Sequence, residues 1–253
     1  MENKFSVDYR IGFNNIMPNL TMNLPGLMHY VQESSLIHTF SNPHSQEYYD
    51  SHKLAWVITH WHVKIKRYPL VNSKVKIRTW PVKFRGFFGE RGFDVQDENG
   101  EILLEANSNW ILIERESHKP FRPSEEIRAQ YGNISSFPFE KDFSMPQPDT
   151  LADFANFARR EYVVMRRDID TNYHANNVRY IEWSFEDVPQ DIYHNMQPCE
   201  LKVAYKKECI AGDKLEILQS IKRKPKEACI LADIVKEDSV ACQIYTKWRE
   251  IEN

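Results

Sequence analysis

The chain has 253 residues, of which 42% are hydrophobic and 27% charged, and its formal net charge is -3. This length suits one large domain or two of moderate size, and the near-neutral charge gives no general attraction to nucleic acid or to an anionic membrane, so neither is predicted as a partner. The four cysteines show no CxxC pair and no zinc-ligand spacing, and we find no secretory leader or transit peptide, which favours reduced thiols and a cytoplasmic location.

The first half of the chain predicts one long helix and several antiparallel strands. Alternation over residues 5–11 predicts a strand, and apolar residues on one face predict a helix over 24–40. Further strands are predicted at 56–65, 74–80, 84–95 and 101–114, with a hairpin turn at Asn99-Gly100. This order indicates a helix packed against an antiparallel sheet.

The second half predicts the same order of elements. A proline-containing stretch without periodicity, 137–149, precedes a possible short helix at 150–159 and a strand at 160–164. A polar loop comes next, followed by a helix predicted over 178–188, capped by Asn176 or Asn177 and ended before Pro189. The remaining strands are predicted at 200–209, 214–222, 228–236 and 240–249.

An internal repeat relates the two halves. Residues 65–77 align without a gap on residues 205–217, an offset of 140 residues (205 minus 65). The helices match more loosely with Tyr30 opposite Tyr180, an offset of 150 (180 minus 30). We therefore predict a duplicated α+β unit, a helix wrapped by an antiparallel sheet. The predicted boundaries are a first domain at 1–135, a linker at 136–158 and a second domain at 159–253.

The polar loop before the second predicted helix is the candidate functional stretch. Residues 168–177 hold two carboxylates, three Asn and one His. Its groups can supply acid/base chemistry and carbonyl binding, and the free N–H groups of a helix start at Asn176 and Asn177 suit an oxyanion. Asp168 is predicted as a capping residue. In the register set by Tyr30 and Tyr180, the first copy has no His or carboxylate here, which indicates that the loop is a local addition to a repeated scaffold.

Several motifs resemble the acyl-acyl-carrier-protein thioesterase family. The loop and helix start, 168–181, is similar to the family signature, and Tyr205-Lys206-Lys207-Glu208-Cys209 is similar to the Tyr-Arg-Arg-Glu-Cys of the plant enzymes. Supporting motifs in the first half are Trp56-Val57-Ile58, Arg67-Tyr68-Pro69, Thr79-Trp80 and Asn109-Trp110. The resemblance spans nearly the whole chain.

This resemblance implies a tandem double hotdog fold and hydrolysis of the thioester that joins a fatty acyl chain to acyl carrier protein, without cofactor or metal. It implies catalytic roles for Asp170, Asn172 and His174 in the loop and for Glu208 after it. In this scheme Glu208 activates water, Asp170 holds the tautomer of His174, and Asn172 binds the carbonyl oxygen or the water. The first domain would supply the acyl pocket, lined by Leu27 and Val31, and the chain looks like a bacterial, cytoplasmic member.

Glu208 and Cys209 cannot both face the substrate if they lie in one regular strand, because neighbouring residues point to opposite faces. Alternation over 200–209 places Cys209 on the apolar face, which favours Cys209 as a nucleophile. The family resemblance favours Glu208 instead, and a bulge near Glu208 would reconcile the two. Glu208 is the predicted catalytic group, and Cys209 is the disfavoured alternative.

Other functions and partners stay open at this point. An acyl-CoA thioesterase and a non-catalytic acyl-binding hotdog protein are the alternatives, and a homodimer is compatible with the sequence. The pair His60 and His62 shares a strand face without a nearby carboxylate, so no metal is predicted. Basic residues of the second copy suit an acidic carrier protein or a solvated sheet face equally well; they are Lys202, Lys206, Lys207, Lys222, Arg223, Lys224 and Lys226.

Overall fold

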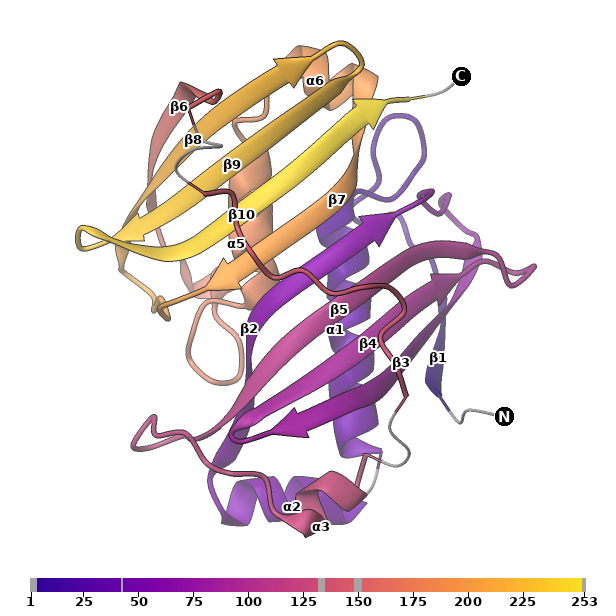
Figure 1. The fold of residues 1–253 in the computed structure, drawn as a ribbon, viewed down its shortest axis with the longest axis vertical. Coiled ribbons are helices and arrows are strands. Elements are labelled where there is room, and N and C mark those ends of the chain that lie inside the picture. The colour runs from indigo at the N-terminus through magenta and orange to yellow at the C-terminus, as the bar shows by residue number, and fades with distance from the viewer. Residues whose placement is uncertain (1–3, 42, 132–134, 148–151, 252–253) are drawn as a thin grey trace. The chain divides into compact units, whose positions relative to one another are not determined.

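The computed structural model describes residues 4–41, 43–131, 135–147 and 152–251. The chain divides into two compact units, Met1–Lys141 and Asp142–Asn253. Each unit contains an antiparallel sheet with a helix against one face (Figure 1). No helix among the described residues combines the length and apolar character needed to cross a bilayer. The exact limits of the predicted domains stay a prediction, since residues 148–151 of the expected linker lie outside the described residues.

The first unit has the strand order β1-β3-β4-β5-β2. Helix α1 contacts β1 and β3 of this sheet. Its N-terminus is capped by Asn23, whose side chain accepts a hydrogen bond from the Gly26 N–H at 2.8 Å, and Pro25 lies in the first turn. The elements are β1 (Phe5–Arg10), α1 (Leu24–Phe40), α2 (Pro43–Ser51), β2 (Leu54–Ile65), β3 (Lys74–Arg85), β4 (Phe88–Gln96), β5 (Ile102–Glu114) and α3 (Glu125–Ala129).

The second unit has the strand order β7-β10-β9-β8-β6. Helix α5 contacts β8 and β10, and α6 packs through Ile192 into a cluster with Ile230 and Trp248. The elements are β6 (Ala155–Val163), the 3-10 turn η1 (Arg166–Asp168), α5 (Asn177–Phe185), α6 (Gln190–Asn195), β7 (Met196–Tyr205), β8 (Lys214–Lys224), β9 (Glu227–Lys236) and β10 (Ser239–Glu250).

The structure confirms the duplication, because matching strands are paired in the same order in both units. Strand β2 ends at Ile65 and β7 at Tyr205, and β3 begins at Lys74 and β8 at Lys214. Both pairs of positions differ by 140 residues (205 minus 65 and 214 minus 74). The sequence alignment of this turn was therefore correct to the residue.

The loop before the helix is also duplicated, with a different offset from the one predicted. The helix caps are Asn23 and Asn176, 153 residues apart (176 minus 23). The Met22 N–H donates to Pro69 O at 2.9 Å, as the Ala175 N–H does to Cys209 O at 2.7 Å. The expected register of 150 is thus wrong by three residues. The correct register places Asp170 opposite Met17, Asn172 opposite Asn19, His174 opposite Thr21 and Tyr180 opposite Leu27.

Three predicted elements differ from the structure. Residues 84–95 are not one strand, because Gly86 adopts φ +59° and reverses the chain between β3 and β4. The helix expected at 150–159 is wrong for residues 155–159, which form the start of β6, where Ala155 pairs with Ile221 of β8, so sheet pairing outweighs local preference; residues 150 and 151 lie outside the described residues. The strand expected at 200–209 ends at Tyr205. Helices α2, α3 and α6 were not predicted.

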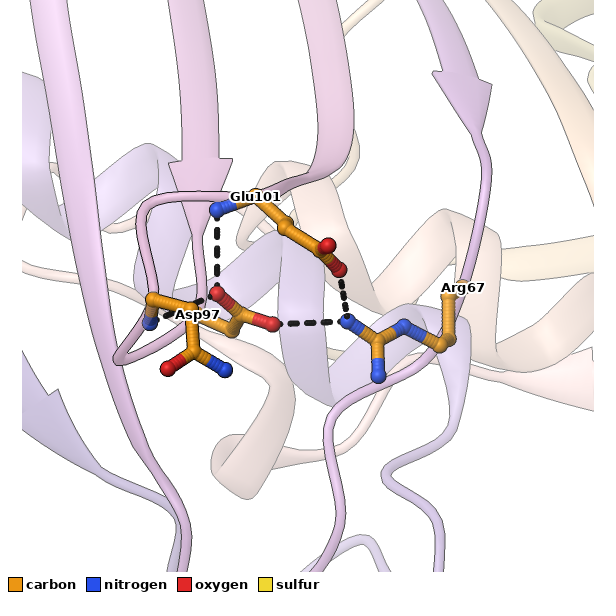
Figure 2. Close-up of polar contacts among 4 residues, drawn as sticks. Arg67, Asp97 and Glu101 are labelled. Carbon is orange, nitrogen blue, oxygen red and sulfur yellow. Dashed lines mark hydrogen bonds and ion pairs between the residues drawn. The ribbon is translucent and has the colours of Figure 1, made fainter.

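The hairpin turn predicted after β4 is present, and an arginine from the turn after β2 holds it (Figure 2). Asp97 accepts the N–H groups of Asn99 and Glu101 at 2.9 and 3.0 Å, which closes the turn. The Arg67 guanidinium donates to Asp97 Oδ2 at 2.7 Å and to Glu101 Oε2 at 3.1 Å. Arg67 therefore ties the turn that follows β2 to the hairpin between β4 and β5.

A cluster of polar side chains, His38 of α1, Thr79 of β3 and Arg91 of β4, lies in the first unit. Arg91 of β4 is buried, and its Nη1 donates to His38 Nδ1 at 2.9 Å and to Thr79 Oγ1 at 3.0 Å. Burial, together with the Arg91 charge, lowers the pKa of His38 to about 3. His38 is therefore neutral near pH 7 and accepts a hydrogen bond from the guanidinium.

Candidate active site

The loop that precedes α5 is closed at its base by backbone and side-chain hydrogen bonds. Asp168 is buried, and its Oδ2 accepts from the Tyr162 hydroxyl and the Met165 N–H, each at 2.8 Å. The Asn176 N–H donates to Asp168 O at 2.8 Å. Asp168 thus has the capping role predicted for it, and the loop returns to its starting point at the first turn of α5.

Asp170 shapes the tip of the loop. Its Oδ1 accepts the Asn172 N–H at 2.7 Å, and its own N–H donates to His174 O at 2.8 Å. The turn places Tyr173 at φ 64°, with its side chain exposed. The role predicted for Asp170 in holding the tautomer of His174 stays a prediction. Asp170 uses its carboxylate to close an Asx turn.

His174 faces Glu208. Its Nε2 lies 3.2 Å from Glu208 Oε2, and the two side chains are 27% and 37% exposed. Glu208 comes from the turn between β7 and β8, whereas His174 comes from the loop before α5. The structure therefore brings together two residues that are 34 positions apart (208 minus 174). A carboxylate beside an imidazole, both partly exposed, can share and move a proton.

Glu208 reaches this position because the strand ends before it. The N–H groups of Lys206 and Lys207 both donate to Ala241 O, at 2.8 and 3.0 Å, so two successive residues oppose one residue of β10. After this point the chain leaves the sheet. The alternation used to orient Glu208 and Cys209 therefore does not apply to them, since it assumed a regular strand through 209.

Cys209 belongs to the buried core of the second unit. Its side chain is fully buried, and burial raises the pKa of its thiol. Its N–H donates to the Tyr180 hydroxyl at 3.1 Å, and its carbonyl accepts from Ala175. A buried thiol with a raised pKa is a poor nucleophile. The residue instead joins the Glu208 turn to the loop through its backbone.

The three asparagines of the loop have different surroundings. Asn172 is exposed, and its carboxamide makes no hydrogen bond among the described residues, so both its donor and acceptor are available. Asn176 caps α5, with its Oδ1 accepting the Val178 N–H at 2.9 Å. Asn177 is the first residue of α5, and its carbonyl accepts from the Tyr205 hydroxyl at 2.8 Å. The helix start is therefore formed as predicted.

Most of the basic residues predicted as a docking patch are already paired. Lys202 is buried against Asp142. Lys222, Arg223 and Lys226 contact Asp153, Asp191 and Glu250. Lys206 and Lys207 are exposed and form no ion pair in the described part of the chain. Lys224 at the end of β8 is likewise exposed and in no ion pair among the described residues, so the basic surface reduces to Lys224 and to the two lysines that directly precede Glu208.

The predicted pocket residues and the predicted histidine pair lie in the first unit. Leu27 and Val31 on α1 are fully buried, and their part in binding an acyl chain stays a prediction. His62 is buried on β2. In the described ranges, no group of three or more His, Cys, Asp or Glu is placed to hold a metal ion.

Two groups beside the site were not found from the sequence. Tyr180 accepts the Cys209 N–H, and Lys236 of β9 lies against the Glu208 turn, with its Nζ 3.4 Å from Glu208 O. A tyrosine on a helix and a lysine at a strand end carry no local signal for such contacts. Only the pairing of the strands brings Lys236 within reach.

Two family models together cover most of the chain. The acyl-ACP thioesterase N-terminal domain matches residues 2–131, and the acyl-ACP thioesterase C-terminal domain matches residues 152–250. The chain belongs to the acyl-ACP thioesterase family.

Curated relatives from plants agree with this assignment. An acyl-[acyl-carrier-protein] hydrolase of Cuphea viscosissima is 27% identical over 86% of the chain and 55% of its own length. A dodecanoyl-[acyl-carrier-protein] hydrolase of Cinnamomum camphora is 25% identical over 92% of the chain and 64% of its own length. The chain thus spans roughly half to two thirds of these relatives. They are chloroplast proteins by name, and the cytoplasmic location predicted for this chain stays a prediction.

Solved structures show that the fold is a double hotdog. The 12:0-ACP thioesterase from Umbellularia californica superposes with a TM-score of 0.83 at 21% identity, over 98% of both chains. An acyl-ACP thioesterase from Bacteroides thetaiotaomicron superposes with a TM-score of 0.78 at 20% identity, over 96% of this chain and 97% of the other. The predicted α+β tandem hotdog fold is confirmed.

Proposed function

We propose that the chain hydrolyses the thioester of fatty acyl-acyl carrier protein and releases a free fatty acid. The observation that carries this proposal is the 3.2 Å contact between His174 and Glu208, in a loop whose Asn172 is exposed and has a carboxamide without a hydrogen bond among the described residues. Membership of the acyl-ACP thioesterase family supports the reaction class. Such a reaction ends the elongation of the acyl chain on its carrier.

In the proposed mechanism, Glu208 accepts a proton from water as the water oxygen attacks the thioester carbonyl. His174, held against Glu208, orients this carboxylate and relays the proton to the departing sulfur. The carbon–sulfur bond breaks, and the products are a carboxylic acid and the thiol of the carrier. A positioned acid/base group of this kind contributes about 10²–10⁴-fold to a rate.

Asn172 is proposed to stabilise the oxygen that becomes negative during attack. Its N–H₂ group is exposed at the loop tip and is not used in the fold. The first turn of α5 adds the positive end of a helix dipole beside it. One donor aimed at a developing oxyanion is worth about 10²–10³-fold in kcat. Asp170 would act by holding the turn that presents Asn172 and His174.

The exposed Lys206 and Lys207 are proposed to steer an acidic carrier protein to this site. Two exposed cations that directly precede Glu208 raise the association rate of a negatively charged partner, and salt weakens that attraction. We expect replacement of both lysines by Gln to raise KM for the carrier-protein substrate several-fold and to remove most of its salt dependence. An unchanged KM would reject this role.

The test of the proposed function compares matched acyl groups on acyl carrier protein and on CoA. We expect free fatty acid from the carrier-protein substrate, with a lower kcat/KM for CoA. A clear preference for CoA would identify an acyl-CoA thioesterase instead. Binding of acyl groups without turnover of either substrate would identify a non-catalytic acyl-binding protein.

A further inference from the structure

An ion pair underlies the turn that carries Glu208. Lys236 Nζ lies 2.6 Å from Asp213 Oδ2, and both side chains are 17% exposed. The same Oδ2 accepts the Ile210 N–H at 2.8 Å, and Lys236 Nζ also donates to Glu208 O at 3.4 Å. Lys236 and Asp213 thus contact the turn at Glu208 and at Ile210, two residues further on.

Both members of this pair are charged near neutral pH. The hydrogen bond to Asp213 raises the pKa of Lys236. Burial alone would raise the pKa of Asp213, but hydrogen bonds from Lys236 and the Ile210 N–H outweigh burial and hold it below its ordinary value. The pair is therefore a fixed pair of opposite charges beneath the turn.

The first unit closes the equivalent turn without this pair. The strand pairing places Asp97 opposite Lys236, because Gln96 pairs with Lys76 whereas Val235 pairs with Glu216, the counterpart of Lys76. The turn offset of 140 residues places Ser73 opposite Asp213 (213 minus 73), so the first unit has a carboxylate in place of the lysine and an uncharged serine in place of the aspartate. There the Ser73 hydroxyl donates to Leu70 O at 2.7 Å, and Arg67 ties the turn to the neighbouring hairpin from outside (Figure 2). Among the described residues, this half-buried lysine–aspartate pair is therefore present only in the copy that holds Glu208 and His174.

We propose that Lys236 and Asp213 are positioning residues that hold the Glu208 carboxylate against His174. This inference rests on the proposed function of Glu208. Lys236 fixes the Glu208 carbonyl, and Asp213 fixes the Ile210 N–H, so the backbone on both sides of Cys209 is held. Their opposite charges cancel beneath the site, which keeps the pair from biasing the protonation of the acid/base groups.

Removing one charge of the pair shifts the protonation of the titratable groups nearby, in a direction set by the charge that remains. Cys209 and Glu237 lie close enough to interact with Lys236, Glu208 is on the turn, and His174 is across the Glu208 contact. Loss of Lys236 leaves the negative charge of Asp213, which favours proton uptake nearby. Loss of the Asp213 charge leaves Lys236, which opposes proton uptake.

The experiment measures kcat, KM and the acid limb of the pH–rate profile for Lys236→Met and Asp213→Asn. We expect kcat to fall about tenfold in each at similar KM, because a misplaced base acts on bound substrate. The acid limb should move to higher pH in Lys236→Met and to lower pH in Asp213→Asn. Each shift should be about half a pH unit, the size expected for one charge roughly 10 Å away in a partly hydrated site.

Matched variants separate positioning from general stability. Lys247→Met removes a lysine of the same sheet that pairs with Glu227 at 2.8 Å, away from the turn, and Arg67→Met removes the tie in the first unit. Both should keep kcat and the acid limb. Lys236→Arg should keep kcat within about threefold, since it retains the charge and a donor. If Lys236→Met fails to fold, Lys236→Gln removes the same charge with a polar side chain.

The inference would be overturned if the acid limb of the pH–rate profile moved equally and in the same direction in Lys236→Met and Asp213→Asn. It would also be overturned if both variants had the same kcat as Lys247→Met. If the unsubstituted protein hydrolyses neither thioester, the proposed function fails separately. In that case the titration midpoint of the His174 imidazole, followed by NMR, still decides the inference. Opposite shifts of that midpoint in the two variants support the pair, and unchanged midpoints reject it.

Discussion

The loops before α1 and α5 have the same backbone and different chemistry. In the first unit the Met17 N–H donates to Thr21 O and the Leu20 N–H to Met17 O; in the second, the Asp170 N–H donates to His174 O and the Tyr173 N–H to Asp170 O. Leu20 and Tyr173 share a positive φ of 63° and 64°. The loop is therefore part of the repeated scaffold, and the expectation that it was a local addition is wrong.

This comparison separates what builds the loop from what makes it a candidate active site. The same loop hydrogen bonds form in both units although the side chains at the matched positions differ. The first unit has Met17, Asn19, Thr21 and Tyr68 where the second has Asp170, Asn172, His174 and Glu208. Reactivity is thus a property of a few side chains on a shared frame. Variants at matched positions of the two units can test this separation directly.

The largest effect is expected at Glu208. Replacement by Gln keeps the size of the side chain but removes the group that accepts the proton, so kcat should fall about 10³-fold. Tyr68→Phe, at the matched position of the first unit, should keep kcat within about twofold. Steady-state hydrolysis of acyl-carrier-protein substrate measures both. A Glu208→Gln enzyme with normal kcat would remove Glu208 from the proposed mechanism.

Replacing Asn172 should lower kcat and not stability, whereas replacing Asn19 should lower stability and not kcat. Asn172→Ala removes a carboxamide that makes no hydrogen bond within the described part of the chain, so kcat should fall about 10²-fold at unchanged stability. Asn19 Oδ1 instead accepts from the Thr21 N–H at 3.1 Å and the Thr21 hydroxyl at 2.7 Å. Asn19→Ala should therefore cost about 0.5–1 kcal/mol of stability and keep kcat.

Urea unfolding and kcat, measured on the same two preparations, check this crossed pattern. A loss of stability in Asn172→Ala that matches the loss in Asn19→Ala would mean that the two side chains have the same structural role. The distinction between a used and an unused carboxamide would then be wrong.

Acid should destabilise the first unit through His38, which lies in the part of α1 that has no counterpart in the shorter α5. Its pKa is about 3 in the fold and about 6.5 when unfolded. Between these values the unfolded state binds more protons, so stability falls as pH falls below 6.5. From pH 7 to pH 5 the loss should be about 2 kcal/mol.

His38→Asn keeps an acceptor for Arg91 and removes the titrating ring, so its stability should change less over this pH range. Urea titrations at pH 7, 6 and 5 on both proteins measure the difference. Parallel pH dependence in the two proteins would show that His38 already binds a proton in the fold.

Cys209 should have the smallest effect. Its carbonyl and N–H bonds to Ala175 and Tyr180 use backbone atoms of Cys209, so Cys209→Ala keeps them and loses the buried sulfur together with its contact to the Tyr180 hydroxyl. We expect a stability loss of about 1 kcal/mol and kcat within threefold. Cys242→Ala, at a second fully buried thiol, is the matched control. Abolished activity in Cys209→Ala alone would make the thiol a nucleophile.

Sequence patterns located the loop, the helix cap at Asn176 and the 140-residue offset, because these depend on local polarity, capping and alternation. They failed where pairing between distant segments decides the structure. The end of β7 at Tyr205 depends on Ala241 of β10 accepting two successive N–H groups, and no residue near Glu208 indicates this. The predicted register of the loop was wrong because it aligned Tyr30 with Tyr180. The helix caps Asn23 and Asn176 mark the correct alignment.

The family resemblance, rather than alternation, favoured Glu208 over Cys209. The geometry agrees with that preference by placing Glu208 beside His174 and burying Cys209. Lys236 and Asp213 lay outside both kinds of reasoning, since their contact with the turn arises only when β9 pairs with β8.

The shared loop backbone makes the first unit a template for enzyme design. Asn19 already matches Asn172. Met17→Asp, Thr21→His and Tyr68→Glu would therefore place the same four side-chain types at the matched positions of the first unit. The protein thus carries, within its own chain, an inert frame on which each component of a catalytic constellation can be installed and measured separately.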